Sequence, residues 1–473
     1  MNAPILKLFG LILLLFGGLA AMTSYNSVIN AEAYRENDKN VRPQIEEQRV
    51  RRGLIRARDG TVLARSVQQS SSLYERRYTA AGGLFAHAIG YDFLRLGRAG
   101  LEREGNDALT GARSELESVF DELRGRQRVG DNVVTNLDPE AQKIAIDALD
   151  GREGSVVAIE PATGKVRVMV SVPSYDPNDL DTGAADAPLL NRATQAGYAP
   201  GSTFKVVTAA AALDSGEFTP ESTVSGRSPV TISAVPLQNF ANMQFGDISL
   251  TTALTNSVNT VWAQVAEQVG NKRMSKYMER FGFLSDPPLD YPDEQLRPSG
   301  VYDLKREQWI PPASQRVDIG RVGIGQERLQ VTPLQMATVA ATVANDGVRM
   351  KPRLTDRIVD VDGRTVERIK PEQAARVMSK SNADKLTEMM SNVVESGTGV
   401  GAALEGVEVA GKTGTAELNI EQRINQPWFI GFAPLDKPKI AVAVTLENIR
   451  GARSQGGAIA APIAKQILQE LAG

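Results

Sequence analysis

An uncharged and largely apolar segment lies near the beginning of the chain, at residues 8–31. A helix over Leu8–Tyr25 would be roughly 27 Å long at ~1.5 Å per residue, which is about the thickness of a bilayer core. Lys7 and the N-terminal amine precede this segment, and positive charge favours the cytoplasmic side. We therefore expect a cytoplasmic tail at residues 1–7, a transmembrane anchor at residues 8–25, and a single-pass protein of the cell membrane whose bulk is extracytoplasmic.

A cleaved signal peptide is the alternative interpretation of the same segment. The small residues Gly18-Leu19-Ala20 keep cleavage possible, although the apolar run is slightly long for a signal peptide. Both interpretations place the remainder of the chain outside the cytoplasm. The choice between them decides only whether the mature protein keeps its membrane anchor.

The next part of the chain, residues 26–150, is rich in charge and irregular in pattern. Arg52–Ile55 and Thr61–Ala64 flank an Asp59-Gly60 turn, which predicts a pair of strands. Asp138-Pro139 is typical of a helix start, and the composition changes shortly after that helix. We expect a small mixed module that serves as a pedestal or in dimerisation and contains no catalytic residue.

Residues 151–473 combine short strand patterns with longer helical ones. A hairpin is predicted within Ser155–Ser171, with its turn at Pro161–Gly164. Three further strand patterns occur near the C-terminal end, at 406–414, 428–433 and 440–446. Helical patterns occur at 203–213, 250–256, 260–269, 385–394 and 458–471, and a long apolar helix ends near Asn345. These patterns predict a large domain of the α+β class.

Composition narrows the chemistry that this chain can perform. The 473 residues include 53 basic and 56 acidic ones, a formal charge of −3, and this balance does not favour a nucleic-acid partner. There is no Cys, which excludes thiolate catalysis, disulfides and sulfur-ligated metals. The one histidine, His87, lies in an apolar setting and is expected to be packed rather than catalytic. We therefore expect no metal and no cofactor, and a Lys, Asp or Glu as the base in any covalent catalysis.

Ser202 and Lys205 form the first candidate catalytic motif. Pro200 and Gly201 precede a helical pattern, so Ser202 is expected at the helix start with Lys205 on the same face. A neutral lysine can accept the serine proton, and a helix N-terminus favours negative charge nearby. Taken alone, the pair is a weak signal and favours a solvated first turn.

Two later motifs, Ser257-Val258-Asn259 and Lys412-Thr413-Gly414-Thr415, stand at other structural junctions. Each is weak alone, because the first could be a loop cap and the second a surface segment. Together with Ser202 and Lys205, these motifs indicate an enzyme that transfers acyl groups. Ser202 would attack a carbonyl and form an acyl-enzyme, and Lys205 would be the neutral base. Burial and the Lys412 cation would both lower the pKa of Lys205.

The remaining motif residues have expected roles in proton transfer and substrate binding. Ser257 can relay a proton, and Asn259 can hold a substrate amide. The segment Lys412–Thr415 is expected on a strand that binds an extended peptide at its edge, where Gly414 allows close backbone approach. Lys412, Thr413 and Thr415 offer donors to a terminal carboxylate, and the backbone N–H groups of Ser202 and Thr415 are the expected oxyanion hole.

In this order the three motifs make the chain resemble the class B penicillin-binding proteins. The resemblance covers most of the chain after the apolar segment and is strongest at 155–177, 201–216, 257–260, 325–347, 396–399, 412–416 and 428–434. Arg52-Gly53 and Gly100-Leu101-Glu102 look like N-terminal signatures of the family, and the compact N-terminal module looks most like the actinobacterial penicillin-binding protein A group. One departure is Asn425-Gln426-Pro427, where relatives often carry a histidine, and it puts a secondary contact in doubt.

The resemblance implies a transpeptidase domain built on a five-stranded antiparallel sheet, with helices on both sides and an all-helical subdomain. It implies peptidoglycan D,D-transpeptidation, in which a D-Ala-D-Ala stem peptide acylates the serine, D-Ala leaves, and an amine of a neighbouring stem accepts the acyl group. It also implies inhibition by β-lactams and a membrane-embedded glycan polymerase as a partner.

Three alternatives stay open at this point. A serine β-lactamase would need a carboxylate that activates water, commonly in a Glu-x-x-x-Asn context, and Asp293–Arg297 does not match this context. The separation of 155 positions from Ser257 to Lys412 (412 − 257) also exceeds what we expect for that class. A D,D-carboxypeptidase would share every motif. A non-catalytic β-lactam-binding scaffold or sensor would use the same fold, although the intact Ser202, Lys205 and Lys412 argue against an idle site.

Overall fold

The computed structural model describes residues 3–30, 48–69, 73–93, 96–111, 129–180, 188–419, 421–451 and 454–473. The first helix, α1, comprises Ala3–Ser24 and continues as a π-helical turn at Tyr25–Ile29. Its most apolar 18-residue window has a mean hydropathy of 2.3, and none of its residues is buried within the structure. It is long and apolar enough to cross a membrane, and it begins at Ala3, five residues before the expected start at Leu8. Residues 1 and 2 of the expected tail lie outside the described residues.

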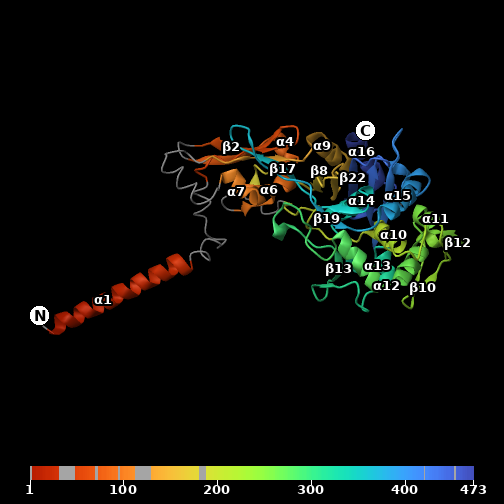
Figure 1. Cartoon of the computed structure of the whole chain (residues 1–473), viewed down its shortest axis with the longest axis horizontal. Coiled ribbons are helices and arrows are strands. Elements are labelled where there is room, and N and C mark those ends of the chain that lie inside the picture. Colours follow the sequence, from red (N-terminus) through yellow and green to blue (C-terminus); the bar gives the residue numbers. More distant parts are fainter. Residues whose placement is uncertain are drawn as a thin grey trace.

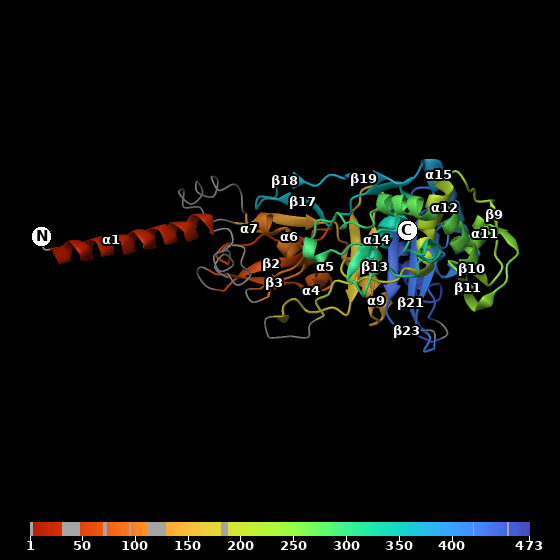
Figure 2. The ribbon, with the colours of Figure 1, turned by 90° about the horizontal axis from the view of Figure 1, so that it is seen from below.

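The N-terminal module is built on a six-stranded sheet with the order β18-β17-β6-β1-β2-β3. Its strands are β1 (Ile55–Arg56), β2 (Val62–Gln68), β3 (Tyr74–Tyr78), β6 (Asn132–Thr135), β17 (Thr355–Val359) and β18 (Thr365–Arg368). β1 and β2 are antiparallel around the predicted Asp59-Gly60 turn, where Gly60 has a φ of 92°. β17 and β18 come from far later in the sequence and lie along this module (Figure 2). The sequence did not predict that a hairpin from residues 151–473 completes this sheet.

A buried ion-pair network joins the two N-terminal signature stretches. Glu102 is fully buried; its carboxylate accepts hydrogen bonds from Arg52 Nη2 at 3.0 Å and from Arg76 Nε at 2.6 Å. Arg52 also pairs with Asp92 at 3.3 Å. Short helices surround this network, namely α4 (Ala80–Gly83), α5 (Ala86–Ile89), α6 (Gly100–Glu104) and α7 (Asn106–Thr110). Each buried charge has an oppositely charged partner, so the network can hold the interior of the module together without the cost of burying an unpaired ion.

The C-terminal domain contains the predicted five-stranded antiparallel sheet, with the order β20-β21-β22-β7-β8. Its strands are β7 (Gly154–Ile159), β8 (Val166–Val172), β20 (Ala410–Asn419), β21 (Ile424–Ala433) and β22 (Ile440–Leu446), with β23 (Ile449–Arg450) paired to β21. The predicted hairpin is therefore confirmed as β7 and β8. β20 begins later than the predicted strand at 406–414, because Gly406 has a φ of 73° and forms a turn.

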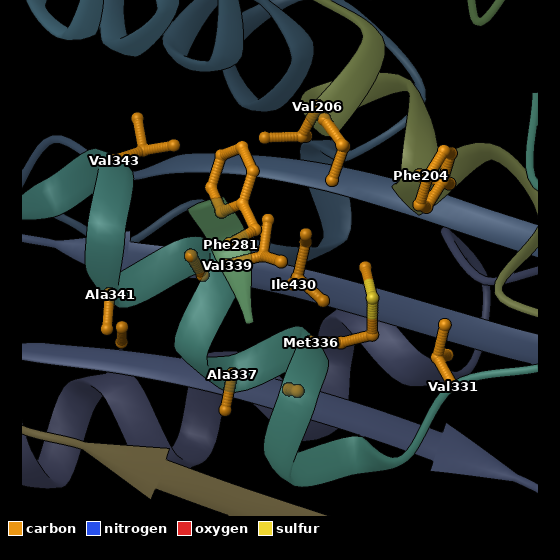
Figure 3. Packing of buried hydrophobic residues seen from close by; sticks show 14 of the residues in the cluster. Phe204, Val206, Phe281, Val331, Met336, Ala337, Val339, Ala341, Val343 and Ile430 are labelled. Carbon is orange, nitrogen blue, oxygen red and sulfur yellow. The ribbon is translucent and has the colours of Figure 1, made fainter. Parts of the chain in front are cut away.

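Both faces of this sheet are covered, as Figure 1 shows for α14 and α16 around β22. Val157 and Ile159 of β7 belong to one apolar cluster, whereas the alternating Val156 and Ala158 belong to another. The first cluster includes α14 (Pro333–Ala344), whose residues are all buried and which Figure 3 shows over Ile430 of β21. The second cluster includes α9 (Pro139–Leu149) and α16 (Ala460–Ala472). The N-cap of α9 is Asp138, as predicted.

A mainly helical part packs beyond α14 and contributes most of the site. Its helices are η3 (Gly201–Phe204), α10 (Lys205–Asp214), α11 (Leu250–Thr255), α12 (Asn259–Phe281), α13 (Ile319–Gly323) and α15 (Lys380–Glu395). α12 continues past the predicted end at 269, through a kink at Gly270 where φ is 79°. α15 begins earlier than predicted because Ser379 caps it by accepting a hydrogen bond from Asn382 N.

Several short strands that the sequence did not predict connect these helices. They are β9 (Thr223–Ser225), β10 (Val230–Ile232), β11 (Val235–Leu237), β12 (Asp247–Ser249), β13 (Gly300–Asp303), β14 (Gln308–Ile310), β15 (Leu329–Gln330), β16 (Val348–Met350) and β19 (Gln373–Arg376). None exceeds four residues in length, so each gives too short a pattern to separate from loop.

Candidate active site

Ser202 lies in the 3₁₀ turn η3, directly before α10, and is partly buried. The preceding Gly201 has a φ of 53°, and its N–H donates to Gly325 O at 3.0 Å. Gly325 itself has a φ of 79°, and a Cβ at this position would lie 1.8 Å from Gly201 O. Two glycines in contact therefore set the turn that presents Ser202, because no side chain fits between these backbones.

The Ser202 turn is docked against the neighbouring strands β20 and β21. Trp428 Nε1 donates to Ala199 O at 3.0 Å, and Thr203 Oγ1 donates to Pro200 O at 2.8 Å. A Cβ at Gly414 would lie 2.7 Å from Pro200 O. Gly414 thus allows β20 to approach the nucleophile turn closely, which is a packing reason for glycine at a position predicted to bind substrate.

Lys205 is fully buried at the first position of α10. Its Nζ donates to Ser257 O at 2.7 Å, Ser257 Oγ at 3.2 Å and Asn259 Oδ1 at 2.7 Å. No hydrogen bond joins Lys205 Nζ to Ser202 Oγ among the residues that the structure describes. Catalytic hydrogen bonds are often long without substrate and shorten in the reacting complex. The structure thus brings the first and second motifs together around one ammonium group.

Ser257 lies in the connection between α11 and α12 and has a positive φ of 57°. Its hydroxyl also accepts a hydrogen bond from Lys412 Nζ at 3.0 Å. A hydroxyl has two acceptor lone pairs and one proton, so Ser257 Oγ can connect two amines and exchange protons with either. The left-handed backbone of a non-glycine residue at this place is a strained feature of the kind found at functional sites.

Lys412 is fully buried in β20 and also donates to Thr413 O at 2.9 Å. Burial lowers the pKa of Lys412 to about 7. Burial, and then the charge of Lys412, hold the pKa of Lys205 well below its usual 10.5. Among the described residues no Asp or Glu forms a salt bridge with either lysine. Both causes that we expected for a neutral Lys205 are therefore present.

Asn259 is the first residue of α12, and its Nδ2 donates to Gln238 O at 3.3 Å. The neighbouring Asn239 is buried, and its Oδ1 accepts a hydrogen bond from Thr260 N at 3.0 Å. Gln238 and Asn239 thus fix the start of α12 and the amide of Asn259. The sequence analysis did not identify either residue. The one signal available was that Asn side chains, such as that of Asn239, often form hydrogen bonds with backbone groups.

Thr413 and Thr415 lie on β20, which is the edge strand of the sheet. Thr415 lies opposite Pro427 of β21, and Pro427 has no N–H to donate to it. The carbonyl oxygen of Pro427 accepts a hydrogen bond from Thr445 Oγ1 on β22, at 3.2 Å. A Cβ at Gly201 would lie 2.9 Å from Thr415 O, so this carbonyl faces the Ser202 turn. The backbone of Thr415 is therefore directed to the open edge of the sheet, next to the nucleophile.

Three other segments that the sequence analysis singled out have structural roles. Glu294 forms an ion pair with Arg103 of the N-terminal module at 2.7 Å, so this segment binds the module. His87 is buried, its Nε2 lies 2.9 Å from Pro188 O, and burial lowers its pKa to about 4; it is packed as expected. Gln426, in the stretch that departs from the family, is buried and donates to Thr445 Oγ1 at 2.7 Å.

Comparison with known proteins identifies the family to which this chain belongs. The family profile "Penicillin binding protein transpeptidase domain" matches residues 154–469. The chain belongs to this family. A second profile, "Penicillin binding protein A dimerisation domain", matches residues 52–133. The resemblance to class B penicillin-binding proteins, and to the penicillin-binding protein A group in particular, is confirmed, as is the fold.

Curated and solved relatives cover nearly the whole chain. It is 36% identical to "Peptidoglycan D,D-transpeptidase PbpA" of Mycolicibacterium smegmatis over 98% of both chains. It is 33% identical to the protein of the same name from Mycobacterium tuberculosis H37Rv over 99% of both. A structure of M. tuberculosis penicillin-binding protein A as a ceftriaxone acyl-enzyme superposes with a TM-score of 0.80 and 33% identity, covering 90% of this chain and 99% of that one.

Proposed function

We propose that this protein is a peptidoglycan D,D-transpeptidase that forms its acyl-enzyme on Ser202. The observation that carries the proposal is the pair of fully buried lysines, Lys205 and Lys412, which share the hydroxyl of Ser257. Lys205 lies about one helical turn after Ser202 along the chain. Curated relatives are named peptidoglycan D,D-transpeptidases. The related M. tuberculosis protein forms an acyl-enzyme with penicillin G.

In the acylation step Ser202 Oγ attacks the carbonyl of the D-Ala-D-Ala bond, and its proton passes to neutral Lys205. The N–H groups of Ser202 and Thr415 stabilise the oxyanion. The proton then moves through Ser257 to the amine of the departing D-Ala, and the C–N bond breaks. In the second step an amine of a neighbouring stem peptide attacks the ester, gives a proton back through the same groups, and releases Ser202.

Substrate binding is assigned to the edge of β20 and to Asn259. Lys412, Thr413 and Thr415 bind the terminal carboxylate of the stem peptide, and Asn259 holds a peptide amide. The extended peptide lies along β20, because the outer side of an edge strand offers free backbone groups. Gly414 keeps β20 close to the nucleophile turn. β-Lactams react at the same serine.

The domain division and location follow from the same assignment. Residues 1–7 are a cytoplasmic tail, 8–25 a transmembrane anchor, 26–150 the pedestal or dimerisation-like module, and 151–473 the transpeptidase domain. The bulk of the chain lies outside the cytoplasm, attached to the cell membrane by one helix. Its partner is a membrane-embedded glycan polymerase, which supplies the strands that this protein cross-links.

The test is the intact mass of the full-length protein in detergent micelles after benzylpenicillin is added, with Ser202→Ala as the control. We expect a long-lived adduct that the Ser202→Ala variant lacks. An adduct that vanishes within seconds would instead identify a β-lactamase, and no adduct would leave the non-catalytic scaffold. Release of D-Ala from a stem peptide, with and without an added amine acceptor, separates a transpeptidase from a D,D-carboxypeptidase.

A further inference from the structure

The hydroxyls of Thr398 and Thr413 lie 2.6 Å apart, within hydrogen-bonding distance. Thr413 belongs to the Lys412–Thr415 motif and is only 6% exposed. Thr398 comes from a different element, the loop Ser396–Gly399 that follows α15, and is exposed. Either oxygen can be the donor in this pair. The proposed mechanism uses Thr413 and gives Thr398 no role.

The position of Thr398 is fixed by its own backbone. Its N–H donates to Thr255 O at the end of α11, at 3.2 Å. On the other side Gly457 approaches so closely that a Cβ there would lie 2.2 Å from Thr398 O. The next residue, Gly399, donates its N–H to Val393 O at 2.8 Å. The backbone of Thr398 is thus held in place between the end of α11 and the segment before α16.

We propose that Thr398 is a positioning residue that directs the Thr413 hydroxyl at the terminal carboxylate of the substrate; this inference rests on the proposed function. Thr398 donates its proton to Thr413 Oγ1, so the Thr413 proton is left for the carboxylate. Such a chain of two hydroxyls strengthens the outer hydrogen bond through polarisation. The neighbouring Thr415 is arranged alike, because its Oγ1 accepts a hydrogen bond from Gly456 N at 3.1 Å.

In the proposed arrangement both threonine hydroxyls of the strand have an acceptor position filled by the protein, which leaves their protons for the ligand. The consequence is selectivity for ligands that carry a carboxylate at this position. Thr398 is exposed, so water can replace its hydroxyl in part. We expect its loss to weaken recognition of the carboxylate by about two- to fivefold, which is the lower part of the range for one neutral hydrogen bond.

The test compares two ligands that differ only in the carboxylate, benzylpenicillin and its methyl ester. Second-order acylation rate constants are measured by intact mass on the full-length protein in detergent micelles. In Thr398→Val the ratio of the acid's rate constant to the ester's is expected to fall by about two- to fivefold. Thr398→Ser restores the ratio. The control Ser396→Ala, in the same loop, loses only a hydrogen bond to Asn392 O and leaves the ratio unchanged.

The ratio is measured within one preparation, so a partly unfolded variant does not distort it. A purely structural role for Thr398 would slow both ligands equally, and that result, or an unchanged ratio in Thr398→Val, would overturn the proposal. Failure of the proposed function has a different signature, since the unmodified protein would then form no adduct or Ser202→Ala would still form one.

Discussion

Lys412 Nζ donates a hydrogen bond to Ser257 Oγ over 3.0 Å, across a separation of 155 residues. The contact joins the second and third motifs; Lys412 is fully buried, whereas Ser257 is half-buried. The neighbouring Lys205 makes the same hydroxyl a bridge between two amines. An arrangement of two ammonium groups without a carboxylate favours loss of a proton, which is what a lysine base requires.

The rate of acylation is expected to pass through a maximum as pH rises. Deprotonation of Lys205, whose pKa is held well below 10.5, increases the rate on the acid side. Lys412 loses its charge as pH passes about 7, and attraction for the ligand carboxylate is then lost. The measurement is the second-order rate constant for benzylpenicillin against pH, which reports the groups of the free enzyme.

Lys412→Arg is the matched variant for this profile, because a guanidinium keeps its charge across the whole range. Whatever its absolute rate, the variant should lack the alkaline fall. An alkaline fall of the same midpoint in both proteins would exclude Lys412 as its source.

The low pKa of Lys412 also makes the stability of the protein depend on pH. The unfolded lysine keeps its proton up to about pH 10.5, whereas the folded one loses it at about 7, so unfolding between these values takes up a proton. The free energy of unfolding therefore rises with pH in that window.

Gly325→Ala is expected to reduce acylation by about a hundredfold or more. A methyl group there would lie 1.8 Å from Gly201 O, so the Ser202 turn must move, and displacement by ~1 Å can cost that factor. Gly363→Ala is the control: Gly363 has a similar positive φ of 83°, but its Cβ would have nothing within 4 Å. Equal loss of activity in both variants would show that backbone strain alone, rather than the contact with Gly201, is responsible.

Glu102→Gln is expected to destabilise the protein by about 3–5 kcal/mol, because the change leaves buried Arg52 and Arg76 without their shared carboxylate. Glu75→Gln removes the partner of Arg77 in a surface pair and should cost at most about 1 kcal/mol. Urea unfolding of the full-length protein, followed by circular dichroism, measures both changes. Similar midpoints for the two variants would contradict a stabilising role for the buried network.

Local signals in the chain were sufficient for several of the longer elements and for the expected closeness of Ser202 and Lys205 in one turn. The apolar run before residue 26, the Asp138-Pro139 helix start and the β7–β8 hairpin depend on neighbouring residues, and each is found as predicted. The pairing of Ser202 with Lys205 in one turn is local in the same way. Such features follow from capping, turn chemistry and periodicity, which act within a few residues.

Contacts between distant segments needed the folded chain. Lys205 meets Ser257 across 52 residues, and Thr398 faces Thr413 from a separate loop. The support of Asn259 by Gln238, and the strands β17 and β18 that complete the N-terminal sheet, gave no recognisable pattern. The physical reason is that residue type and periodicity state which face of an element is buried, but not which partner or register covers it. That choice is made by the packing of all elements at once.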